Sequence, residues 1–94
     1  MNRVLVVDDD AKMRAALAVH FARNGWAVET ASGVAEALIK FRQKLHSIII
    51  SDVRMPDGDG FSLMRKVRTM APKTAIVLLT AFASACWAGR LIAP

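Results

Sequence analysis

The sequence predicts an α/β protein in which helices alternate with the strands of a parallel sheet. Four short apolar runs rich in β-branched residues alternate with three stretches of helical periodicity, a pattern typical of βαβ units. The 94 residues allow one domain at most. Apolar residues make up 54% of the chain, which is enough for a packed core.

The first strand and helix are predicted close to the N-terminus. Residues 4–7 form an uninterrupted apolar run, which indicates a strand buried on both faces. Residues 11–23 have helical spacing, and either Asp9 or Asp10 stands where a helix cap is expected; we expect Asp10 to be the cap. The pair Asn24-Gly25 predicts the end of this helix.

The middle of the chain repeats the pattern. Residues 26–31 predict a less apolar strand, which suits an edge of the sheet. Residues 34–44 predict a second helix, and residues 47–51 predict a third strand that is buried. Residues 52–60 are rich in Asp, Gly and Pro and predict a loop, in which Asp57 and Asp59 are expected to form turns.

The last predicted elements are a helix and a strand. Residues 61–71 have helical spacing, and Ala71-Pro72 predicts the stop. Residues 75–79 form a fourth apolar strand, which ends at Thr80. Right-handed crossovers bring the carboxyl ends of parallel strands to the same edge of the sheet, where ligands bind. The residues that directly follow strands are therefore expected to share that edge: Asp8, Asp9, Asp52 and Thr80.

This group of residues predicts a site for a hard cation. Three carboxylates that converge repel one another and raise each other's pKa values unless a cation neutralises them. Carboxylates, carbonyl oxygens and water suit Mg²⁺. A carboxylate can also act as a nucleophile and form an aspartyl-phosphate, and the Thr80 hydroxyl could then donate to a phosphoryl oxygen. The alternative, in which Asp8 and Asp9 only favour a helix start, loses weight because Asp52 is expected opposite them.

Three separate stretches resemble the receiver domains of response regulators in two-component signalling. These stretches are Val4-Leu5-Val6-Val7-Asp8-Asp9-Asp10, Ser51-Asp52-Val53-Arg54-Met55-Pro56-Asp57-Gly58-Asp59-Gly60 and Ile76-Val77-Leu78-Leu79-Thr80-Ala81. The resemblance spans residues 3 to about 82 and implies a flavodoxin-like fold with strand order 2-1-3-4 in this chain. The wording of residues 51–56 most resembles regulators that activate transcription with an AAA+ partner domain.

The resemblance also implies the roles of individual residues. Asp52 would accept the phosphoryl group from a histidine kinase, and Thr80 would reorient toward it as a switch. Asp9 and Asp52 would bind Mg²⁺ through their side chains, Arg54 through its backbone carbonyl, and Asp8 mainly through water. Such a module phosphorylates and dephosphorylates itself and is not a conventional enzyme.

The sequence departs from the family after Thr80. Residues 81–94 are too few for the family's fourth helix, fifth strand and fifth helix, and its lysine–proline pair is missing. We therefore expect a receiver-like domain at 1–82 and a divergent or truncated tail at 83–94, with no fifth strand and no last helix. Residues 75–79 would then form a hydrophobic edge that promotes self-association.

Composition restricts the other classes of function. The net charge is +5, but most acidic residues lie in two clusters and the basic residues are scattered, so we expect no direct nucleic-acid binding. No apolar run approaches a membrane span and no signal peptide is evident. The single cysteine, Cys86, cannot form an internal disulfide, which fits the cytoplasm.

Two functions stay open: a phosphorylated signalling module, or a truncated or frame-shifted receiver that only binds or oligomerises without switching. A hydrolase that uses an aspartyl-phosphate is disfavoured, because the chain has no room for a helper region.

Overall fold

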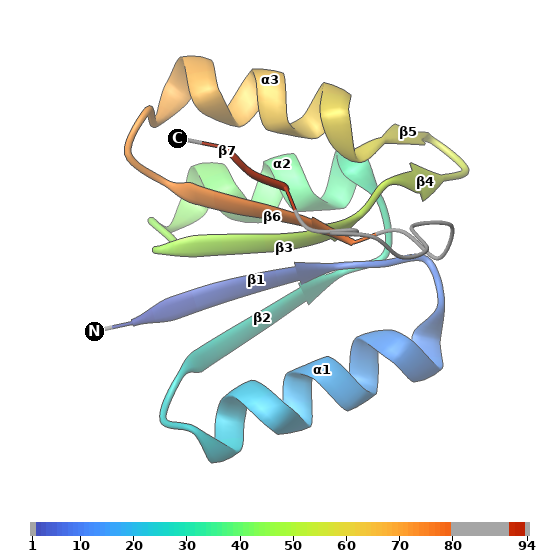
Figure 1. Cartoon of the computed structure of the whole chain (residues 1–94), viewed down its shortest axis with the longest axis vertical. Helices are drawn as coiled ribbons and strands as arrows, with labels where there is room; N and C mark the ends of the chain where they lie inside the picture. The colour runs from blue at the N-terminus through green and yellow to red at the C-terminus, as the bar shows by residue number, and fades with distance from the viewer. Residues whose placement is uncertain (1, 80–90, 94) are drawn as a thin grey trace.

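The computed structural model describes residues 2–79 and 91–93. Strands and helices alternate up to β3, and two short strands precede the last helix (Figure 1). The elements are β1 Arg3–Val7, α1 Ala11–Arg23, β2 Ala27–Ala31, α2 Val34–Gln43, β3 Ile48–Asp52, β4 Arg54–Met55, β5 Gly58–Asp59, α3 Gly60–Met70, β6 Ala75–Leu79 and β7 Leu91–Ala93. The three predicted helices and four predicted apolar strands are confirmed to within a residue or two at their ends. Within the described residues, no helix is long and apolar enough to cross a membrane.

The main sheet has the order β2-β1-β3-β6-β7. The pairs β1–β2, β1–β3 and β3–β6 are parallel. The predicted order of the first four strands is therefore confirmed, with β6 in the fourth place and β2 at an edge. Asp52 pairs with Leu79 in the β3–β6 register, so these two strands end at the same level.

A short fifth strand pairs with β6, which the sequence did not predict. Residues 91–93 run antiparallel to β6 and pair with residues 76–78. The expectation of an unpaired edge is therefore wrong over Ile76–Leu78. An antiparallel neighbour can pair with β6 without a crossover helix. The unpaired backbone N–H and C=O groups of an apolar edge strand favour pairing with any segment that can reach them. The predicted domain boundary at residue 82 lies outside the described residues.

The helices cover both faces of the sheet. α1 lies on one face, and α2 and α3 lie on the other (Figure 1). The strand β1 contributes to both cores because side chains alternate along a strand. Leu5 and Val7 join the larger core with α2 and α3, whereas Val4 and Val6 join a smaller core against which Leu17 and Phe21 of α1 pack.

The loop predicted at residues 52–60 contains a small hairpin. β4 and β5 pair antiparallel, with Arg54 opposite Asp59 and Met55 opposite Gly58. Met55 is buried in the larger core, so the hairpin is attached to the rest of the molecule. Two-residue strands follow no periodicity long enough to be recognised in a sequence.

Candidate metal centre at the carboxyl edge of the sheet

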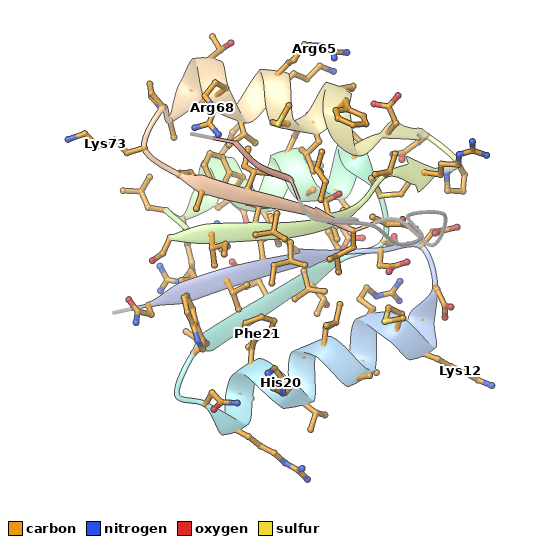
Figure 2. All side chains as sticks on the ribbon, viewed as in Figure 1. Lys12, His20, Phe21, Arg65, Arg68 and Lys73 are labelled. Atoms are coloured by element: carbon orange, nitrogen blue, oxygen red, sulfur yellow. The ribbon has the colours of Figure 1, made fainter. Side chains whose placement is uncertain are left out.

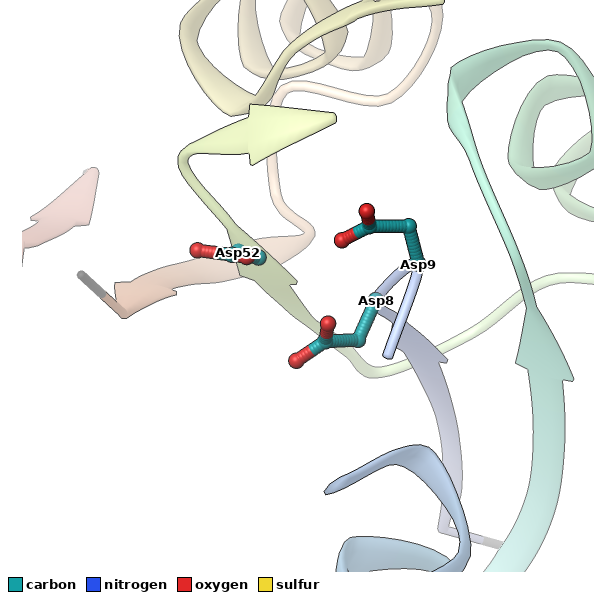
Figure 3. A group of neighbouring side chains, drawn as sticks. All are labelled: Asp8, Asp9 and Asp52. Atoms are coloured by element: carbon teal, nitrogen blue, oxygen red, sulfur yellow. The ribbon is translucent and has the colours of Figure 1, made fainter. Parts of the chain in front are cut away.

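Three aspartates converge at the carboxyl edge of the sheet (Figure 3). Asp8 and Asp9 follow β1, and Asp52 is the last residue of β3. One carboxylate oxygen from each lies within 4.8 Å of the others. The β1–β3 register explains the convergence, because Val7 pairs with Ser51 and the aspartates are the residues that come next on the two strands. The structure thus brings together the three carboxylates that the sequence placed at this edge.

Within this cluster the pKa of Asp8 is raised above its usual value. Its side chain is buried, and burial is the main reason that the pKa of Asp8 is raised. The negative charges of Asp52, Asp9 and Asp10 raise this pKa further. The backbone N–H of Asp10 opposes them and lowers the pKa, because it donates to Asp8 Oδ1 at 2.9 Å. A cation would relieve this repulsion.

Asp52 is held in place by its own loop. The backbone N–H of Val53 donates to Asp52 Oδ1 at 2.8 Å and also to the Leu79 carbonyl at 3.0 Å. The Ser51 hydroxyl donates to the Asp52 carbonyl at 2.9 Å. The side chain of Asp52 is half-buried, so it can be reached from solvent while its backbone is fixed.

Arg54 and Thr80 are the two other predicted site residues. Arg54 lies two residues after Asp52 and begins the hairpin. Its role as a carbonyl ligand stays a prediction. Thr80 lies outside the described residues, although the pairing of Leu79 with Asp52 brings the end of β6 level with the end of β3.

Two residues near the site have contacts that the sequence did not predict. The Arg14 guanidinium Nη1 donates to the Asp8 carbonyl at 2.8 Å, so α1 brings a cation beside the acidic cluster. Asp57 accepts hydrogen bonds from the backbone N–H groups of Val34 and Ala35, at 2.9 and 3.0 Å. The sequence held one signal for the Asp57 contact. Gly33, which precedes the predicted helix at 34–44, has no side chain to cap it, so a cap from elsewhere in the chain could have been expected.

The predicted cap of the first helix has the expected geometry. Asp10 Oδ1 accepts hydrogen bonds from the N–H groups of Lys12 at 2.9 Å and Met13 at 3.3 Å. Asp59, predicted as a turn residue, is the N-cap of α3 and accepts from the N–H of Ser62 at 2.7 Å. These two aspartates therefore have structural partners of their own.

The donor set of the cluster fits a hard divalent cation. All three side chains offer oxygen, the ligand atom that Mg²⁺ and Ca²⁺ prefer, and no sulfur or imidazole ligand is part of the group that the structure describes. Two of the lysines lie away from the cluster. Figure 2 shows Lys73 at the opposite end of the sheet and Lys12 pointing outward from α1.

A family model matches nearly the whole chain. The model for the response regulator receiver domain matches residues 4–93. Among curated proteins, the regulatory protein AtoC of Escherichia coli is 32% identical over 83 residues, which are 88% of this chain and 18% of AtoC. The probable transcriptional regulator ycf27 of Porphyra purpurea is 38% identical over 85 residues, 90% of this chain and 35% of that protein. The chain thus spans about a fifth to a third of the length of these relatives.

Solved structures agree with this match. The response regulator TrrA of Thermotoga maritima, solved in complex with Mg²⁺-BeF, is 34% identical with a TM-score of 0.84, over 88% of this chain and 72% of TrrA. The chemotaxis protein CheY4 of Vibrio cholerae is 37% identical with a TM-score of 0.85, over 90% of this chain and 72% of CheY4.

Proposed function

Because this chain belongs to the family of response regulator receiver domains, we propose that it accepts a phosphoryl group on Asp52 from a histidine kinase, in a reaction that needs Mg²⁺. The single observation that carries the proposal is the convergence of Asp8, Asp9 and Asp52 within 4.8 Å. The complex of TrrA with Mg²⁺-BeF supports the choice of metal, since TrrA is similar to this chain over most of its length.

The proposed reaction is a transfer between two nucleophiles. A carboxylate oxygen of Asp52 forms a bond to phosphorus, while the bond from phosphorus to the histidine ring nitrogen of the kinase breaks. The electron pair of the broken bond stays on that nitrogen, and the product is an acyl phosphate on Asp52. When bound, Mg²⁺ offsets the negative charge that the carboxylates share with the phosphoryl oxygens.

Residues of the chain would bind the metal, orient the nucleophile and contact the phosphoryl group. Asp9 and Asp52 would bind the metal through their side chains, Arg54 through its backbone carbonyl and Asp8 mainly through water. The hydrogen bond from the Val53 N–H to Asp52 Oδ1 fixes the orientation of the nucleophile. Thr80 would donate its hydroxyl to a phosphoryl oxygen and so sense the modification.

We propose that the phosphorylated domain acts in the cytoplasm, in a pathway that regulates transcription. The relative ycf27 is named as a probable transcriptional regulator, and AtoC is named as a regulatory protein. The wording of residues 51–56 still favours the AAA+ subfamily within that class. The output would belong to a partner or to another segment, because the basic residues of this chain form no stripe that fits nucleic acid.

A second function, binding without switching, is favoured by one observation. Among residues 81–94 the only basic residue is Arg90, so these residues contain no lysine that could match the family's. Arginine does not replace lysine at a site that needs a compact point charge. In this reading residues 1–82 would bind a kinase or a metal, and residues 83–94 would be a divergent tail.

Labelling with a small phosphodonor separates the two functions. Acetyl phosphate with Mg²⁺ should add one phosphoryl group to the chain, as measured by intact-protein mass spectrometry, and EDTA should abolish the addition. Asp52→Asn should remove the label, whereas Asp10→Asn, a matched change at the cap of α1, should keep it. A wild-type chain that stays unlabelled under these conditions would favour the binding function.

A further inference from the structure

Helix α2 begins without a cap of its own. The first N–H groups of a helix have no partner within it, and the N-cap residue Gly33 has no side chain to offer. The carboxylate of Asp57 supplies the missing acceptors from a distant part of the chain. Its Oδ1 accepts from the N–H of Val34 at 2.9 Å, and its Oδ2 accepts from the N–H of Ala35 at 3.0 Å.

Asp57 stands between β4 and β5, in the hairpin that directly follows Asp52. At the base of the hairpin the N–H of Gly60 donates to the Val53 carbonyl at 2.7 Å. At the other end, the two hydrogen bonds of Asp57 attach the hairpin to α2. Met55 also packs the hairpin into the core, but these two hydrogen bonds to α2 come from the single side chain of Asp57.

The residues around Asp57 leave space for its carboxylate. A Cβ atom on Gly33 would lie 2.6 Å from Asp57 Oδ1 and 3.0 Å from Oδ2. Gly33 has φ −172° and ψ −174°, an extended conformation open to any residue. A side chain at residue 33 would thus have to displace the nearby carboxylate, whereas the backbone conformation itself would accept one.

We infer that Asp57 is a positioning residue for Asp52: it fixes the hairpin β4–β5 against the start of α2, and thereby fixes the backbone from Asp52 to Arg54 for metal binding. The inference rests on the proposed function, in which Arg54 offers its carbonyl to Mg²⁺. Groups that orient metal ligands without touching the metal typically change metal affinity by about 10- to 100-fold when they are removed. Asp57→Ala should therefore weaken Mg²⁺ binding by about 10-fold.

Calorimetric titration with Mg²⁺ alone measures this effect on the full chain. Asp57→Ala and Asp57→Asn are compared with the wild type and with Glu36→Gln. Glu36 is the matched control because it also holds the chain just before α2, accepting from the N–H and the hydroxyl of Ser32 at 2.9 Å, and these hydrogen bonds do not involve the hairpin. We expect Asp57→Ala to lose affinity, Asp57→Asn to retain part of it through one remaining acceptor, and Glu36→Gln to match the wild type. Equal affinity for Asp57→Ala and the wild type would overturn the inference.

A second variant tests the same contact from the other side. Gly33→Ala should displace the Asp57 carboxylate and weaken Mg²⁺ binding to a similar degree, and it should have no further effect in the Asp57→Ala background. Independent effects of the two changes, or an equal loss in Glu36→Gln, would show general destabilisation and overturn the inference. Gly33→Ala also keeps the test valid if Asp57→Ala does not fold.

The controls separate this inference from the proposed function. If the wild type neither binds Mg²⁺ nor accepts a phosphoryl group, the proposed function fails and the inference fails with it. If the wild type does both, and the Asp57 variants bind Mg²⁺ as tightly as the wild type, the proposed function stands and the inference alone fails.

Discussion

The carbonyl oxygen of Asp52 lies so close to Gly60 that a Cβ atom at residue 60 would come within 2.6 Å of it. The same Cβ would lie 2.9 Å from Leu78 Cδ2, in the core. Gly60 is buried and is the first residue of α3. The start of α3 and the end of β3 can therefore approach one another only because residue 60 has no side chain.

Gly60→Ala should destabilise the fold and distort the Asp52 loop. Overpacking of a filled site costs about 1–3 kcal/mol, and the backbone carbonyl of Asp52 cannot move aside as a flexible side chain can. The free energy of unfolding, measured with urea, should fall by about that amount, and phosphoryl labelling should fall with it. Gly25→Ala is the control: Gly25 has φ +86° and a Cβ atom there would have no neighbour within 4 Å, so this variant should lose stability but keep its labelling. Labelling of Gly60→Ala at the wild-type rate would contradict the prediction.

Asp8→Asn should stabilise the metal-free chain. Burial and the neighbouring carboxylates raise the pKa of Asp8, so the folded state disfavours its charge. A group with a raised carboxyl pKa costs stability above that pKa and the cost disappears as the pH falls through it. Asn removes the charge and can still accept the N–H of Asp10. In EDTA at neutral pH, Tm should rise above that of the wild type, and the further gain on adding Mg²⁺ should shrink.

A control substitution locates this effect in the cluster. Asp59→Asn changes an aspartate that caps α3 and is not one of the three converging carboxylates. It should not raise Tm in EDTA. A lower Tm for Asp8→Asn than for the wild type in EDTA would mean that hydrogen bonding at residue 8 outweighs the repulsion.

Glu36 should account for part of the chain's acid sensitivity. The N–H of Ser32, then Lys40 and the Ser32 hydroxyl, lower the pKa of Glu36 from 4.5 to about 2. A lowered carboxyl pKa gives stability that is present above the unfolded value and is lost as the pH falls from 4.5 toward about 2. Because the side chain is 44% exposed, the contribution is screened and should be about 1 kcal/mol or less. Glu36→Gln should therefore lose less stability than the wild type between pH 5 and pH 3 in urea titrations; an equal loss would contradict the assignment.

The sequence predicted the central fold well because apolar runs carry a strong signal. Residues 4–7 and 49–50 are buried, with side chains on both faces of the sheet, so the uninterrupted apolar character of these strands identified them as interior. The convergence of Asp8, Asp9 and Asp52 followed from one rule, that parallel strands share a carboxyl edge. Nothing beyond strand order was needed to bring these three residues together.

The features that were missed depend on contacts between distant segments. Asp57 was expected only to form a turn, because a cap for Val34 is normally sought within a few residues of the helix. β7 was missed since three residues carry no periodicity, and its pairing depends on the open edge of β6. Arg14 looked like any exposed helix residue until the turn after β1 brought the Asp8 carbonyl to it.

Removal of β7 should promote self-association. β7 pairs with Ile76–Leu78, so it covers the backbone of an apolar strand that would otherwise form the edge of the sheet. Exposed apolar edges pair with other chains. A chain shortened by residues 91–94 should therefore dimerise or aggregate at concentrations where the full chain does so less, as measured by size-exclusion chromatography with light scattering. If the shortened and full chains have the same mass over the same concentration range, the β6 edge does not control association; a dimer that forms equally in both would then have to use another surface.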